Sequence, residues 1–62
     1  MKEYYVIKDL RDNSYVCLDK EFSDDIMSAH EFETEQEAIN YAERNLDYYF
    51  TFTIEKVYQI NK

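Results

Sequence analysis

The chain has 62 residues, of which 45% are hydrophobic and 34% charged, and its net charge is −7 at pH 7. This length predicts one domain over residues 1–62, near the lower size at which a hydrophobic core can stabilise a fold unaided. The single cysteine excludes an internal disulfide, and no apolar run reaches the roughly 18 residues of a membrane span. The acidic balance disfavours direct binding to nucleic acid or to membrane surfaces.

Two strands are predicted at the start of the chain. Residues 3–9 contain the run Tyr-Tyr-Val-Ile, whose β-branched and aromatic side chains lack helical spacing and favour a central strand buried on both faces. Asp12 and Asn13 tolerate positive φ and predict a hairpin turn. Residues 14–19 then form the return strand, antiparallel to the first.

The middle of the chain is polar. Residues 20–25 are typical of a charged loop or of the start of a helical turn. Residues 27–33 predict a short third strand, with Met27 and Ala29 on one face. Because both faces mix apolar and polar side chains, we expect this strand at an edge of the sheet.

Residues 34–44 carry the signals of a helix. Thr34 and Glu37 form a capping box, in which the threonine hydroxyl accepts the N–H of Glu37 and the glutamate carboxylate accepts the N–H of Thr34. Asn45 is expected to take the left-handed conformation after the helix. The apolar face consists of Ala38, Ile39, Tyr41, Ala42 and Leu46.

Residues 47–62 predict a long last strand with apolar side chains at even positions. This length exceeds that of a usual strand, which favours a bulge near Glu55 and Lys56 or an extension that meets another copy. The fold class is α+β: a three- to four-stranded sheet in the order β-β-β-α-β with one helix packed on one face. A right-handed crossover places the last strand beside the first and parallel to it, in strand order 3-2-1-4.

Carboxylates concentrate in residues 19–37, where eight of them accompany one lysine, so this third of the chain carries the whole net charge of −7. Such a field attracts basic proteins. Six of these carboxylates are predicted to bind a partner, together with two tyrosines, a residue type enriched in interfaces. The set is Asp19, Glu21, Asp24, Asp25, Glu31, Glu33, Tyr48 and Tyr49. The alternative for the carboxylates is a solvated face that binds nothing.

Motifs for catalysis or for a cofactor are lacking in the sequence. Cys17 and His30 are the only soft metal ligands and are too few for a closed zinc site, so we expect a core thiol and a surface imidazole. The acidic run lacks the glycine and the closing glutamate of a calcium loop. Without any glycine, a backbone cannot easily approach a substrate. We therefore expect no enzymatic activity, no cofactor and no metal.

Three segments together resemble small accessory proteins encoded by phages and prophages of low-GC Gram-positive bacteria. They are Lys2–Asp9, Ser14–Asp19 and the pattern Phe32-x-Thr34-x-x-Glu37-Ala38, which precedes an aromatic last strand. The resemblance implies a protein that binds host or defence machinery, as anti-CRISPR-type inhibitors do, in the host cytoplasm. It carries over no active residues.

Two functional hypotheses follow. In the first, the protein is a non-enzymatic inhibitor whose acidic segment takes the place of nucleic-acid phosphates in the groove of a basic, nucleic-acid-handling host protein. In the second, it is a self-associating structural or regulatory module, such as a homodimer, that uses its C-terminal strand as the interface. The unpaired thiol of Cys17 favours a reducing, cytoplasmic location in both cases.

Overall fold

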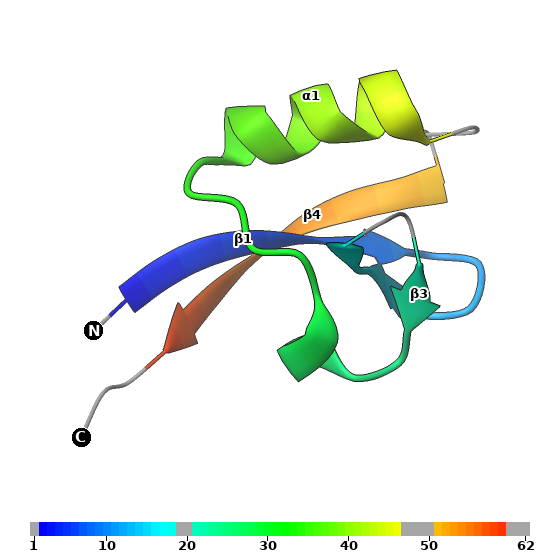
Figure 1. Cartoon of the computed structure of the whole chain (residues 1–62), viewed down its shortest axis with the longest axis horizontal. Helices are drawn as coiled ribbons and strands as arrows, with labels where there is room; N and C mark the ends of the chain where they lie inside the picture. Colours follow the sequence, from blue (N-terminus) through cyan, green and yellow to red (C-terminus); the bar gives the residue numbers. More distant parts are fainter. Residues whose placement is uncertain (1, 19–20, 47–50, 60–62) are drawn as a thin grey trace.

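The computed structural model describes residues 2–18, 21–46 and 51–59. It confirms the α+β class, with a four-stranded sheet in the order β3-β2-β1-β4 and one helix across one face (Figure 1). The elements are β1 (Lys2–Asp9), β2 (Ser14–Val16), β3 (Phe22–Ser23), the 3₁₀ helix η2 (Ile26–Ser28), α1 (Glu35–Asn45) and β4 (Phe52–Gln59). None of the described helices is long and apolar enough to span a membrane.

β1 is the central strand and is buried on both faces, as its run of apolar residues predicts. Val6 and Ile7 point to opposite faces, and both are 0% exposed. On the side of α1, Ile7 packs with Val16, Phe32, Ala38, Ala42 and Leu46. On the other side, Val6 packs with Tyr4 and Ala29. The strand therefore supports two small clusters rather than one core.

The turn between β1 and β2 uses Asp12 and Asn13, and this prediction is confirmed. Asn13 has a φ of 62°, and its N–H donates to the carbonyl of Asp9 at 2.8 Å. The Asp12 carboxylate accepts from the N–H and the hydroxyl of Ser14, at 3.1 and 2.7 Å. Asparagine and aspartate thus close a tight turn without glycine.

The predicted third strand is wrong. Residues 26–28 form η2, because the Asp25 carboxylate accepts the N–H of Met27 at 2.9 Å and starts a helical turn. Ala29 and Phe32 make only isolated bridges, to Cys17 and Tyr5. The third strand is instead Phe22–Ser23, which lies in the stretch expected to be a loop and pairs with β2.

The strand order is as predicted, but β4 runs antiparallel to β1, not parallel. The chain returns to the first half of β1 after β3, where Phe32 pairs with Tyr5. The 11 residues of α1 span about 16 Å and carry the chain along β1 towards Asp9. β4 therefore starts beside Asp9 and runs back.

The start of α1 is confirmed and its end differs from the prediction. The Thr34 hydroxyl accepts the N–H of Glu37 at 3.1 Å, although the reciprocal bond from the N–H of Thr34 is absent among the described residues. Ala38, Ala42 and Leu46 are buried. Asn45 is still helical and donates to the Tyr41 carbonyl at 3.1 Å, while Leu46 follows in extended conformation with a φ of −115°. The helix thus ends with an extended, buried Leu46 instead of the expected left-handed turn at Asn45.

β4 pairs continuously with β1, from Lys2 opposite Gln59 to Asp9 opposite Phe52. The expected bulge near Glu55 and Lys56 is therefore wrong within this range. Phe52 and Ile54 pack against the cluster under α1. The remainder of the predicted last strand, residues 47–50 and 60–62, lies outside the described residues.

Asp9 carries a charge into the interior, at 2% exposed. Arg11 donates to both carboxylate oxygens through Nε and Nη2, at 3.1, 3.2 and 2.7 Å. Its backbone N–H adds a bond at 2.9 Å. The Arg11 side chain holds the pKa of Asp9 below its usual value, against the opposing effect of burial.

We predict that Asp9→Asn lowers the free energy of unfolding at pH 7 by about 1–3 kcal/mol, because it removes a charge-assisted pair. The folded pKa lies below the unfolded one, so this stabilisation is present above the unfolded pKa of about 3.9 and is lost as the pH falls through the folded value. Denaturant titrations of both proteins should therefore converge in acid. Glu43→Gln, at an exposed site, is the control and should change little; equal stability of Asp9→Asn and wild type at pH 7 would contradict the prediction.

Candidate functional site

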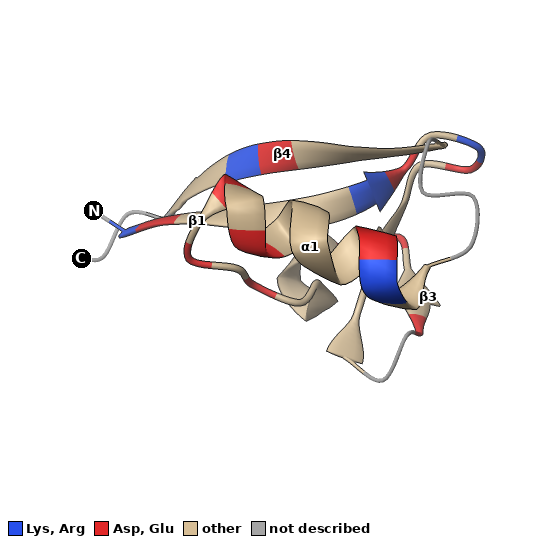
Figure 2. Cartoon of the chain, turned by 90° about the horizontal axis from the view of Figure 1, so that it is seen from above, with Lys and Arg blue, Asp and Glu red and all other residues tan. Residues whose placement is uncertain are grey.

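The predicted binding residues that the structure describes lie on the segment from Glu21 to Glu37, here called the acidic connection. It begins one residue before β3, continues through η2 and ends in the first turn of α1, and Figure 2 shows its acidic positions spread along this path. Its carboxylates are all on exposed residues: Glu21, Asp24, Asp25, Glu31, Glu33, Glu35 and Glu37. Asp19, Tyr48 and Tyr49 lie outside the described residues.

Two of these carboxylates already have structural roles. Asp25 caps η2, as described above. Glu31 forms an ion pair with Lys2, with 3.1 Å between Oε1 and Nζ. In the described part of the chain, the side chains of Glu21, Asp24 and Glu33 have neither an ion pair nor a hydrogen bond, so these three carboxylates are available to a partner.

The acidic connection does not gather its carboxylates into one cluster. Within residues 2–18, 21–46 and 51–59, no group of three or more histidine, cysteine, aspartate or glutamate residues could hold a metal ion. The acidic positions follow one another along an extended path from β3 to the first turn of α1 (Figure 2). The arrangement suits a broad electrostatic surface better than an ion site.

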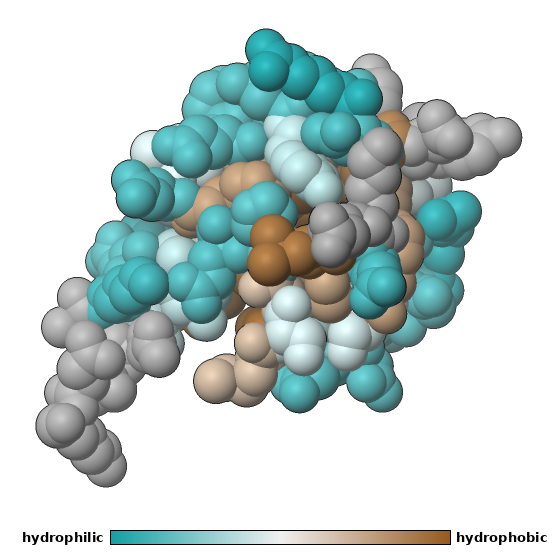
Figure 3. Space-filling model, in the orientation of Figure 1, coloured by the Kyte–Doolittle hydropathy of each residue, from teal (hydrophilic) through white to brown (hydrophobic). Residues whose placement is uncertain are grey.

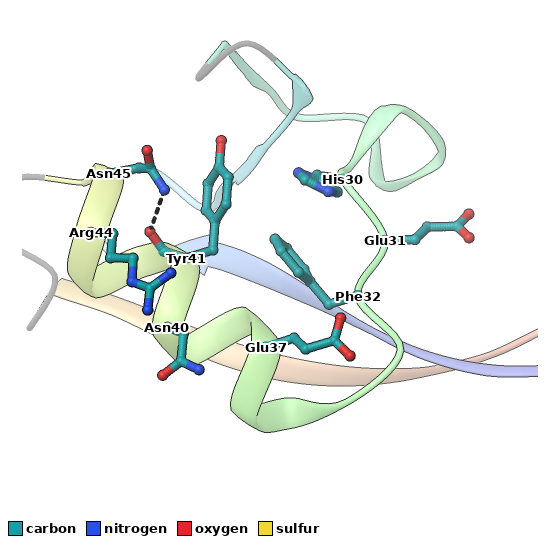
Figure 4. Close-up of a pocket in the computed structure, with 8 residues that line it drawn as sticks. All are labelled: His30, Glu31, Phe32, Glu37, Asn40, Tyr41, Arg44 and Asn45. Atoms are coloured by element: carbon teal, nitrogen blue, oxygen red, sulfur yellow. Dashed lines mark hydrogen bonds between the residues drawn. The ribbon is translucent and has the colours of Figure 1, made fainter.

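An open pocket of about 370 Å³ lies between the end of the acidic connection and α1. The connection contributes His30, Glu31 and Phe32, and the helix contributes Glu37, Asn40, Tyr41, Arg44 and Asn45 (Figure 4). The four residues at 37, 40, 41 and 44 share one helix face by their spacing. Figure 4 shows the rings of His30, Phe32 and Tyr41 grouped together, with Glu31 pointing away.

The predicted surface position of His30 is wrong, because its ring is partly buried among aromatic neighbours. It stacks on Phe32 with centroids 4.2 Å apart and meets Tyr41 edge-on at 5.2 Å. Its backbone N–H donates to the Val16 carbonyl at 3.0 Å. The ring nitrogen Nδ1 is buried without a hydrogen-bond partner in the described structure. A buried polar atom without a hydrogen-bond partner is uncommon in folded proteins.

The sequence analysis did not identify this pocket, although the residues that the helix contributes to it follow a recognisable pattern. The helical spacing of Glu37, Asn40, Tyr41 and Arg44 is a recognisable signal. His30 belongs to a segment that was expected to be an edge strand, so no pattern related it to the helix. The pocket combines aromatic walls with charged groups of both signs, which suits a side chain of a partner protein.

The surface around the pocket combines apolar and hydrophilic side chains. Figure 3 shows a band of apolar surface below α1, framed by hydrophilic side chains. Among the residues that the structure describes, the exposed large hydrophobic ones are Leu10, Leu18, Phe22, Met27 and Tyr58. Exposed apolar side chains are ordinary in a small protein and do not by themselves define a site.

Cys17 is a core thiol, as predicted. It is 8% exposed, and its Sγ lies 3.6 Å from the Tyr15 carbonyl. Burial raises the pKa of the thiol, and the charges of Glu21 and Asp25 raise it further. Little thiolate therefore forms at neutral pH, and Cys17 is poorly suited to act as a nucleophile.

We predict that Cys17 in the native protein reacts with iodoacetamide at pH 8 about tenfold or more slowly than in urea-unfolded protein, because burial withholds the thiolate. Mass spectrometry of timed samples measures both rates. A free cysteine-containing peptide in the same buffers corrects for the effect of urea. Native and unfolded rates that agree would show that Cys17 is accessible and reactive.

Comparison of the chain with protein-family models, with curated proteins and with solved structures gives no match. The resemblance to phage-encoded accessory proteins therefore stays a prediction, and the function has to be argued from the surface itself.

Proposed function

We propose that this protein is a non-enzymatic binding module whose acidic connection contacts a basic surface on a partner protein. The observation that carries the proposal is the position of Glu21, Asp24 and Glu33. Their carboxylates are exposed and unpaired in the described structure, on a segment that leads into an open aromatic pocket. Unpaired charge on a surface speeds encounter with a partner of opposite charge.

The pocket supplies the second part of the proposed interface. A basic side chain seated in the pocket would lie near the Glu37 carboxylate and could gain a cation–π contact from the exposed side of the Phe32 and Tyr41 rings, which pack against each other with centroids 5.3 Å apart. Arg44 lies further along the helix, beyond Asn40 (Figure 4). The pocket would thus hold one anchoring residue while the acidic connection provides long-range attraction.

The class of partner that fits this surface best is a protein with a basic groove, such as one that handles nucleic acid. Carboxylates spaced along an extended path can occupy positions where such a groove holds phosphates. With the resemblance to phage accessory proteins, this leads us to propose inhibition of a host or defence protein in the cytoplasm. The buried, unpaired thiol of Cys17 is compatible with a reducing compartment.

We predict that Glu33→Lys weakens binding to such a partner by about fivefold or more, because it reverses an unpaired charge at the interface. Glu43→Lys is the matched control: it changes the net charge equally, is also exposed, and lies outside the acidic connection. Affinity capture from lysate of a low-GC Gram-positive host provides the partner, and titration calorimetry at low and high salt measures the binding.

Wild-type affinity should fall as salt rises, since exposed charges are screened over about 8–10 Å at physiological ionic strength. Capture that recovers no basic or nucleic-acid-binding protein contradicts the proposal. Equal effects of Glu33→Lys and Glu43→Lys would also contradict it, because they would reduce the role of the acidic connection to net charge alone.

A second candidate function, self-association through the C-terminal strand, is favoured by the position of β4 at the edge of the sheet. Edge strands present unpaired backbone groups to which another copy can add. Sedimentation equilibrium over a wide range of protein concentration tests it. A monomer throughout that range would remove this candidate.

A further inference from the structure

Within the described residues, β4 presents a regular set of unpaired backbone groups. Tyr5 uses its N–H and C=O to bond Phe32, at 2.8 and 2.9 Å, so these groups point away from β4. Leu10, by contrast, donates to the Thr51 carbonyl at 2.8 Å. In an antiparallel ladder the bonding direction alternates, so even residues of β1 bond odd residues of β4. The outward N–H and C=O groups of β4 therefore belong to Phe52, Ile54, Lys56 and Tyr58.

The outer side of β4 is open within the described structure. Figure 2 shows β4 as the last strand on its side of the sheet, with no described segment beyond it. The other edge is the two-residue strand β3, which is too short to template a partner. β4 is thus the one long edge among the described strands.

An apolar groove runs beside this edge. A hollow of about 160 Å³ lies between α1 and β4, lined by Ile39, Ala42, Glu43, Phe52 and Ile54. Its volume is of the order of one or two aliphatic side chains. A strand added to β4 would direct every second side chain to the face of the sheet that α1 covers, and hence into this groove.

We infer that the β4 edge and the groove beside it bind an extended segment of a partner protein, with apolar residues at alternate positions and basic residues between them. Backbone bonds to Ile54 and Lys56 would provide affinity, and the groove would select the apolar residues. This surface lies on the opposite side of α1 from the aromatic pocket and is independent of the acidic connection.

The charges at this edge favour a basic segment. Basic residues between the apolar ones would point to the face of the sheet opposite α1, which is the face of Glu55. Lys56 is already paired with Glu3 at 3.3 Å. Glu55 lies 3.8 Å from Lys8, a long contact that leaves room for a second cation. The edge therefore attracts positive charge.

A second copy of the chain fits this edge less well. Two β4 strands related by a two-fold axis must pair residues of the same face, so the registers with the largest overlap place Glu55 against Glu55 or Lys56 against Lys56. Like charges directly opposite each other destabilise a strand pair. A partner segment with basic residues avoids this repulsion.

The test uses a synthetic peptide, acetyl-Arg-Val-Thr-Leu-Lys-Val-amide, titrated into the ¹⁵N-labelled protein and followed by NMR. The amides of Ile54, Lys56 and Tyr58 should shift and gain protection from exchange. Lys56→Pro should weaken binding about tenfold relative to Lys56→Ala. Both variants lose the pair with Glu3, but only proline removes the outward N–H, and it breaks no bond to β1.

Two further peptides keep the result decisive even where Lys56→Pro perturbs the fold. The acidic analogue acetyl-Glu-Val-Thr-Leu-Glu-Val-amide should bind wild type about tenfold more weakly. A peptide N-methylated at the amides that face β4 should lose binding, while methylation of the alternate amides should not. Equal binding of all peptides, absent binding, or shifts confined to residues 21–37 would overturn the inference. Protection of the edge that depends on protein concentration without peptide would assign it to a second copy instead.

Discussion

The pair of backbone hydrogen bonds between Tyr5 and Phe32 determines how the rest of the chain is arranged. β2 covers only the last part of β1, pairing at Lys8 and Asp9. Phe32 bonds Tyr5 at 2.8 and 2.9 Å and so occupies the same edge where β2 is absent. This contact returns the chain to the beginning of β1 before α1 starts. The direction of α1 and of β4 follows from that return.

Because α1 then lies lengthwise over the sheet, it has a free flank on each side. Ala38 and Ala42 are small enough to bring the helix close to β1, which leaves larger residues to either flank. Tyr41 closes the aromatic pocket against the acidic connection, whereas Ile39 lies over the groove beside β4. One helix therefore borders two grooves of different chemistry, one shared with the acidic connection and the other with β4.

The features that the sequence predicted are those decided by neighbouring residues. The turn at Asn13, the cap at Thr34 and the burial of β1 depend on local conformational preference and on periodicity. The prediction of a third strand at residues 27–33 was wrong because the hydrogen bond from the Met27 N–H to the Asp25 carboxylate starts a helical turn, and the strand pattern there is weak. The predictions of the direction of β4 and of the position of His30 were wrong for another reason. Both features depend on the pairing of Phe32 with the distant Tyr5, and the spacing of nearby residues does not encode that pairing.

The distribution of cations explains why the acidic connection keeps its charge after folding. Three of the four ion pairs in the described structure lie on the sheet and its first turn: Lys8–Glu55, Arg11–Asp9 and Lys56–Glu3. The two pairs whose groups are all partly exposed, Lys8–Glu55 and Lys56–Glu3, contribute about 0–1 kcal/mol each, so their larger effect is on where charge is neutralised. Of the cations that the structure describes, only Lys2 forms an ion pair with the acidic connection. Folding thus neutralises the sheet and leaves the connection negative, which is the property that a basic partner would recognise.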